Sequence, residues 1–127
     1  MLTSLLRGTI PSTMPHRPLS IRAIYEHATT VHARKHVVSR DGPRIVRFTF
    51  AEFGARVARL ANVLRTLGVE PGDRVASFAW NGNRHLELYY AVPMIGAVLH
   101  TVNIRLFPDQ VAYVIEQVSD VVKEGRR

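Results

Sequence analysis

The segment from Thr49 to Gly68 constrains the fold more than any other part of the chain. Thr49 and Glu52 have the spacing of a capping box, in which each side chain accepts a hydrogen bond from the other residue's backbone amide. The apolar side chains that follow at three- and four-residue spacing are Phe50, Phe53, Val57, Leu60, Ala61, Leu64 and Leu67. Gly68 comes next, where a left-handed residue ends a helix most easily. The pattern predicts an amphipathic helix over about 50–67.

This predicted helix needs a partner surface. The burial of one apolar stripe does not by itself offset the conformational entropy lost when a segment of this length is ordered. The helix must therefore pack on a sheet or on other helices, and the rest of the chain has to supply them.

Upstream of the helix, the sequence predicts a shorter helix and a hairpin. Ser20 is a favourable N-cap for a helix that runs to about His32. Two short extended runs, 36–39 and 45–48, flank the turn residues 40–44.

Downstream, strand and helix signals alternate. The pattern predicts a strand over 74–80 that is buried on both faces, a helix over 84–95 and a second buried strand over 97–102. Pro108 is well placed to begin a last helix. We therefore expect an α/β fold in which a β-hairpin precedes alternating strands and helices with a mostly parallel sheet.

Composition narrows the classes of function. The 127 residues contain no cysteine, which excludes disulfides and thiolate chemistry and fits a cytoplasmic location. No apolar run is long enough to predict a transmembrane segment, and the six histidines form no metal-binding pattern. The net charge of +7 is compatible with nucleic-acid binding. The arginines are dispersed along the chain, however, which favours solvated surface charges over a nucleic-acid-binding face.

The first residues allow two interpretations. Residues 1–25 contain arginine, serine and threonine but no acidic residue, as in some targeting segments. Pro11, Pro15 and Pro18 interrupt any amphipathic helix there. We expect an N-terminal extension, partly irregular, over 1–17.

Several motifs together resemble one enzyme family. The run 48–53 (FTFAEF) is similar to the first core motif of adenylate-forming enzymes, and 67–76 (LGVEPGDRVA) follows at the family's spacing. The runs 90–103 (YAVPMIGAVLHTVN) and 105–108 (RLFP) are closer still to medium- and long-chain fatty-acid–CoA ligases. The likeness covers residues 7–118, and the order and spacing of the motifs carry it.

The resemblance implies ATP-dependent activation of a fatty acid to an acyl-adenylate, followed by transfer to CoA. It also implies Mg²⁺ for the intact family. That chemistry needs a Gly-rich Ser/Thr loop, carboxylates for the metal and a catalytic lysine. The sequence contains no such loop, and its lysines are Lys35 and Lys123. We therefore expect no catalytic residue and no metal site in these residues.

Candidate binding residues come from the predicted strand ends, where α/β folds bind ligands. His100 and Asn103 end the second strand and are candidates to approach substrate or CoA, although a core histidine and a loop cap explain them as well. Arg105 is a candidate contact for a CoA phosphate or a solvated arginine. Trp80, Asn81 and Arg84 follow the first strand in the same way.

The sequence leaves three functions open. We expect residues 18–119 to be the N-terminal part of an AMP-binding domain and 120–127 to be a divergent or truncated tail, so that the chain is inactive by itself. The alternatives are a stand-alone interaction or dimerisation module that self-associates through exposed apolar faces, and a basic nucleic-acid-binding domain.

Overall fold

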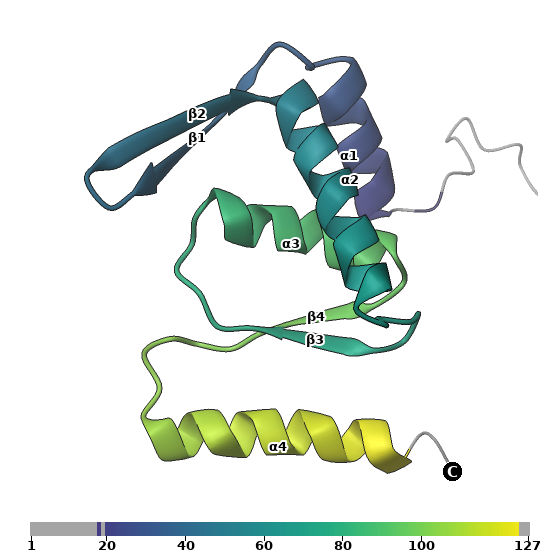
Figure 1. Ribbon diagram of the computed structural model, residues 1–127, viewed down its shortest axis with the longest axis vertical. Helices are drawn as coiled ribbons and strands as arrows, with labels where there is room; N and C mark the ends of the chain where they lie inside the picture. The colour runs from purple at the N-terminus through teal and green to yellow at the C-terminus, as the bar shows by residue number, and fades with distance from the viewer. Residues whose placement is uncertain (1–17, 19, 125–127) are drawn as a thin grey trace, which may run out of the picture.

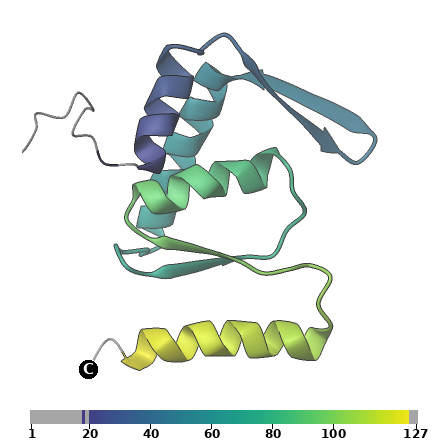
Figure 2. The same cartoon turned by 180° about the vertical axis from the view of Figure 1, so that it is seen from behind.

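A computed structural model describes residue 18 and residues 20–124, so the predicted extension over 1–17 lies outside the described residues. The elements follow the order α1–β1–β2–α2–β3–α3–β4–α4. In Figure 1, α1 and α2 lie side by side at the top, α3 crosses below them, and α4 runs below β3 and β4. Figure 2 shows the same arrangement from behind.

The upstream elements form as predicted. Helix α1 (Ile21–Thr30) begins after Ser20, whose hydroxyl accepts the Ala23 amide at 3.3 Å. Strands β1 (His36–Asp41) and β2 (Arg44–Thr49) pair antiparallel in a hairpin. Its turn needs a glycine, because Gly42 has a φ of 58°.

Helix α2 (Phe50–Thr66) carries the predicted capping box. The Thr49 amide donates to Glu52 Oε2 at 2.7 Å, and the Glu52 amide donates to Thr49 Oγ1 at 3.2 Å. Gly68 has a φ of 87°, as expected of a residue just past a helix end. Leu67 differs from the prediction: it is the C-cap residue, and its side chain is 75% exposed because the last turn extends beyond the core.

The parallel sheet has two strands. Strand β3 (Arg74–Ser77) pairs with β4 (Val98–Thr101), and α3 (Asn83–Met94) connects them. The β1–β2 hairpin forms a separate sheet, so β2 does not join the parallel pair. The fold class is therefore confirmed as an incomplete α/β arrangement, with the hairpin set apart from the parallel strands.

Two details of β3 were predicted wrongly. The strand ends at Ser77 rather than at Trp80, and Trp80 is 73% exposed. Ser77 is buried on the side that faces α3, whereas Ala76 is exposed on the other side. The reason is that few residues of the last helix reach that second face of the sheet, so only one face is covered.

Helix α4 (Pro108–Glu124) begins at the predicted proline. It continues through residues 120–124, which belong to the segment expected to be a divergent or truncated tail. No glycine or proline interrupts these residues, so the helical pattern simply propagates. Within the part of the chain that the structure describes, no helix is long and apolar enough to cross a membrane.

The core lies between α2, α3 and the hairpin. Phe53, Val57 and Val92 are the largest fully buried side chains, and the Tyr90 ring meets the Phe53 ring edge-on with centroids 5.3 Å apart. Arg56 also bridges these elements: its guanidinium lies 5.4 Å from the centre of the Phe48 ring of β2. This packing holds α3, and with it the strand ends, in a fixed position.

Candidate functional site

A cavity of about 370 Å³ lies at the carboxyl ends of β3 and β4. Parallel strands bring their carboxyl ends to one edge of a sheet, which is where α/β folds bind ligands. We call it the strand-end cavity. It is lined by Ala79, Trp80, Asn81, His85, Tyr89, Thr101, Asn103, Ile104 and Arg105.

The loop after β4 supplies the polar rim of this cavity. The Arg105 amide donates to the Asn103 Oδ1 at 3.0 Å, which closes a tight turn and fixes both residues at the rim. Both side chains are exposed. No carboxylate of the described residues forms an ion pair with Arg105, which is one of the residues that line the cavity.

Beside the rim lies a buried polar pair. Ser77 Oγ and His85 Nε2 are 3.1 Å apart, and both residues are more than nine-tenths buried. The Nδ1 of His85 has no hydrogen-bond partner among the described residues. The His85 ring also lies against the Tyr89 ring, with centroids 5.1 Å apart. The helix α3 thus brings an imidazole and a phenol to the cavity from successive turns.

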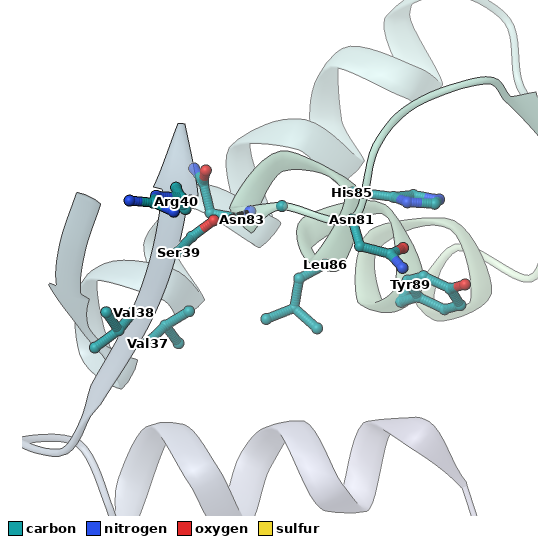
Figure 3. Close-up of a pocket in the computed structure, with 10 residues that line it drawn as sticks. Val37, Val38, Ser39, Arg40, Asn81, Asn83, His85, Leu86 and Tyr89 are labelled. Atoms are coloured by element: carbon teal, nitrogen blue, oxygen red, sulfur yellow. Dashed lines mark hydrogen bonds between the residues drawn. The ribbon is translucent and has the colours of Figure 1, made fainter. Parts of the chain in front are cut away.

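A second cavity, of about 400 Å³, lies between the hairpin and the start of α3; we call it the hairpin cavity. Figure 3 shows Val37 and Ser39 of β1 on the side of the strand toward the first turns of α3, and Val38 and Arg40 on its other side. The Ser39 hydroxyl accepts the Asn83 amide at 3.0 Å.

This hydrogen bond has a clear structural role. Gly82, the N-cap residue of α3, has no side chain that could satisfy the first amides of the helix. The Ser39 hydroxyl therefore caps α3 from the neighbouring hairpin, and it ties the hairpin to the helix that carries His85.

The structure brings together some of the residues predicted from the sequence. Asn103 and Arg105 line the strand-end cavity together with Trp80 and Asn81. His100 is half-buried and is not among the lining residues, and its Nδ1 is buried without a partner among the described residues. Arg84, also named as a strand-end candidate, is exposed and does not line the cavity.

Sequence reasoning missed three residues at this site. Ser77, His85 and Tyr89 were not singled out, although a sequence signal for two of them exists. His85 and Tyr89 are four residues apart, so a helix places them on one face. Ser77 becomes recognisable only when the strand is known to end there.

The two groups with shifted pKa values lie elsewhere. Burial raises the pKa of the Tyr25 phenol, and the hydrogen bond from the Thr49 backbone lowers the pKa of the Glu52 carboxyl. Among the described residues, no group of three metal-ligating side chains comes together. The residues of the strand-end cavity, which include no carboxylate, therefore do not fit Mg²⁺.

Comparison with known proteins identifies the family of this chain. A family model described as AMP-binding enzyme matches residues 25–122, which is more than three quarters of the chain. The chain therefore belongs to the AMP-binding enzyme family, and its similarity within that family is to the CoA ligases.

Curated relatives include fatty-acid–CoA ligases. The chain is 47% identical over 116 residues to a long-chain-fatty-acid–CoA ligase of Thermus thermophilus, with 91% of this chain and 21% of the relative covered. It is 42% identical over 110 residues to a medium-chain-fatty-acid–CoA ligase of Ectopseudomonas oleovorans, with 86% of this chain and 20% of the relative covered. The chain thus spans about a fifth of the length of these relatives.

Solved structures agree with this assignment. A fatty acyl CoA synthetase of Mycobacterium tuberculosis matches with a TM-score of 0.62 at 30% identity, over 73% of this chain and 18% of that chain. A putative long-chain-fatty-acid CoA ligase of Rhodopseudomonas palustris matches with a TM-score of 0.65 at 38% identity, over 72% of this chain and 23% of that chain. The N-terminal subdomain of Klebsiella oxytoca NpsA has the same fold, with a TM-score of 0.70 at 20% identity. The match covers 79% of this chain and 26% of that chain.

Proposed function

We propose that this chain supplies part of the scaffold and of the CoA-binding face of an ATP-dependent fatty-acid–CoA ligase. The strand-end cavity is the observation that carries the proposal, because it sets an unpaired arginine and two exposed amides at the edge where an α/β sheet binds its ligand. Residues 18–119 are the part that we assign to the scaffold, with 1–17 and 120–127 as flanking segments. We also propose a cytoplasmic location, because the co-substrates ATP and CoA are present there.

CoA fits the chemistry of this cavity. Its phosphates are anionic, and the Arg105 guanidinium offers them charge-assisted hydrogen bonds. The side-chain amides of Asn81 and Asn103 supply further donors and acceptors, and the exposed Trp80 ring offers a flat apolar surface for the adenine base. His100 takes no part in this proposal, because it does not line the cavity.

We expect the 127 residues to be inactive by themselves. Adenylate formation needs groups that hold the triphosphate, Mg²⁺ and the reacting carboxylate. The sequence has no Gly-rich Ser/Thr loop, and Lys35 and Lys123 are its lysines. Incubation with ATP, Mg²⁺ and a fatty acid should therefore give no acyl-adenylate above background. Formation of that product by the purified chain would contradict this part of the proposal.

Calorimetric titration of the chain with CoA tests the binding site. Replacement of Arg105 by alanine should weaken CoA binding about tenfold, which is the usual size of a lost charge-assisted contact. Arg74→Ala is the matched control, because Arg74 is also exposed but lies at the opposite end of β3. Equal loss in both variants, or no saturable binding by the unaltered chain, would refute the CoA site.

A second candidate function is self-association. Large aromatic side chains are exposed beside the strand ends: Phe78 is 58% exposed, Trp80 73% and Phe107 72%. Apolar surface of this kind marks interaction sites in many proteins. Light scattering across a concentration series distinguishes the outcomes: a defined dimer supports an interaction module, whereas a monomer at all concentrations rules it out. Growth without a fixed size would indicate aggregation of an incomplete sheet.

A further inference from the structure

The β1–β2 hairpin extends away from the helices and is strongly basic (Figure 1). Between positions 34 and 47, five cationic residues are opposed by one carboxylate, that of Asp41, so this segment has a net charge of +4 out of +7 for the whole chain. All five are exposed, and none forms an ion pair with a described residue. They are Arg34, Lys35, Arg40, Arg44 and Arg47.

One face of the hairpin mixes arginine with exposed aliphatic side chains. The register sets Val38 opposite Arg47 and Arg40 opposite Ile45, and the side chains of paired residues lie on the same face of a sheet. Val38 is 54% exposed and Ile45 is 67% exposed. Phe48, on the other face, is buried in the core, so the mixed face is turned away from the core. We call it the outer face of the hairpin.

Strand β2 also has a free backbone edge. The Phe50 amide donates to the Lys35 carbonyl at 2.8 Å, so residues 35 and 50 form a hydrogen-bonded pair. Hydrogen-bonded and non-hydrogen-bonded pairs alternate along an antiparallel ladder, which makes the pairs that contain Ile45 and Arg47 non-hydrogen-bonded. The N–H and C=O groups of these two residues therefore point away from β1. No other described strand pairs with β2.

A free strand edge beside a basic face fits an extended acidic peptide. Such a peptide can pair with the outward N–H and C=O groups of Ile45 and Arg47, and its carboxylates on the outer face then lie beside the Arg47 guanidinium. Charge complementarity and backbone pairing thus select the same class of partner.

Other occupants fit the hairpin less well. A lipid bilayer would leave the backbone groups of the β2 edge without partners. Single-stranded nucleic acid stacks its bases on aromatic rings, but the single Phe, Tyr or Trp residue of the hairpin, Phe48, is buried. A second copy of the hairpin would bring arginines against arginines, which is unfavourable in neighbouring strands.

We propose that the β2 edge of the hairpin binds an extended acidic segment of a partner protein as a third strand. Along this segment, aliphatic and acidic side chains share the outer face, with the aliphatic side chain beside Ile45 and the carboxylate beside Arg47. The inference goes beyond the proposed CoA site, because neither residue lines the strand-end cavity.

Hydrogen exchange of the full chain tests the strand pairing. The probe is a blocked peptide of about ten residues in which glutamate and valine alternate, long enough for a typical strand. It should slow exchange at the Ile45 and Arg47 amides about tenfold, whereas the Val46 amide, which already pairs with β1, should change little. An analogue N-methylated at alternate residues keeps the charge but cannot donate along one edge, and it should leave exchange unaltered.

Charge reversal tests the role of the arginine. Arg47→Glu should weaken binding of the glutamate–valine peptide at least about tenfold and should allow binding of a matched lysine–valine peptide. Arg59→Glu is the control, because Arg59 is an exposed residue of α2 and its replacement changes the net charge equally. Both variants should keep the circular dichroism spectrum and the CoA titration of the unaltered chain, so that failure here is separable from failure of the CoA site.

Four outcomes would overturn the inference. Equal losses in Arg47→Glu and Arg59→Glu would show that the peptide responds only to net charge. Equal slowing of exchange by the N-methylated analogue would exclude strand pairing. Absence of saturable peptide binding would leave the arginines as protection against pairing between copies of the hairpin. Binding of an oligonucleotide or of phosphatidylserine vesicles that depends on Arg47, without peptide binding, would assign the outer face to that partner instead.

Discussion

The Arg56 guanidinium of α2 lies 2.6 Å from the Glu87 carboxylate of α3, and the Glu87 side chain is only 8% exposed. The two residues are 31 positions apart in the sequence, so this ion pair fixes how the two helices cross. A carboxylate buried to this extent is stable only while its partner remains.

We therefore expect Arg56→Ala to destabilise the fold by about 2–4 kcal/mol, because it leaves the Glu87 charge buried without a partner. Chemical denaturation measures the change. Arg22→Ala is the control, since the Arg22–Glu26 pair is exposed on both sides and should contribute less than about 0.5 kcal/mol. Similar losses of stability in the two variants would show that burial of Glu87 does not increase the free-energy cost of breaking its ion pair.

Gly54 lies on the face of α2 that packs against Tyr25 and Thr29 of α1. A Cβ atom at this position would lie 2.8 Å from Thr29 Cγ2, nearer than real contacts allow. Gly54→Ala should therefore cost about 1–3 kcal/mol in thermal or chemical unfolding, even though alanine favours helices.

A second substitution tests the cause of that loss. Thr29→Ser removes the clashing methyl group but keeps the hydroxyl that donates to the Tyr25 carbonyl at 2.9 Å. The double variant should recover most of the stability lost in Gly54→Ala. No recovery would mean that a different contact resists the added Cβ, such as the Tyr25 hydroxyl, which would lie 3.3 Å from it and which donates to the Gly54 carbonyl.

The Ser39 cap of α3 predicts a local effect. Ser39→Ala should destabilise by about 0.5–2 kcal/mol and should speed hydrogen exchange at the Asn83 amide. Ser39→Thr keeps the hydroxyl and should preserve the slow exchange. If the Asn83 amide exchanges equally fast in the serine, threonine and alanine forms, the hairpin does not cap the helix.

The capping box gives a pH dependence with a definite sign. The pKa of Glu52 is lowered from its ordinary value of 4.5, chiefly by the hydrogen bond from the Thr49 backbone. A lowered folded-state pKa stabilises the protein above the unfolded-state value, and this stabilisation is lost as pH falls from about 4.5 through the folded-state pKa. Glu52→Gln should therefore flatten the acid side of a stability–pH curve. An unaltered curve would assign the acid sensitivity to other carboxyls.

Local signals predicted most elements of this fold, since a few side chains determine each of them. The pair Thr49 and Glu52 was enough to place the start of α2, and Pro108 marked the first residue of α4. These features depend on residues no more than a few positions apart. Sequence reasoning is reliable at that range, because the geometry of a cap or a turn repeats from protein to protein.

The parts that failed depend on distant neighbours. Nothing within the sequence around Trp80 shows that the facing layer leaves it exposed, so the strand was predicted three residues too long. Asn103 and Arg105, chosen at a predicted strand end, line the strand-end cavity, because the ends of parallel strands meet at one edge. Their role in binding stays a prediction. Its wall was missed, since the contact between Ser77 and His85 depends on how α3 packs on β3.

The hydrogen bond between Ser39 and the Asn83 amide spans 44 positions of sequence. Contacts of such high separation form late, because the loop between them must first be closed. During synthesis on the ribosome, the hairpin emerges well before α3, and the Ser39 hydroxyl has no Asn83 amide to accept until the helix forms. A folding defect in the hairpin should therefore delay the formation of α3, which is synthesised later. Pulsed labelling of nascent chains would measure this delay.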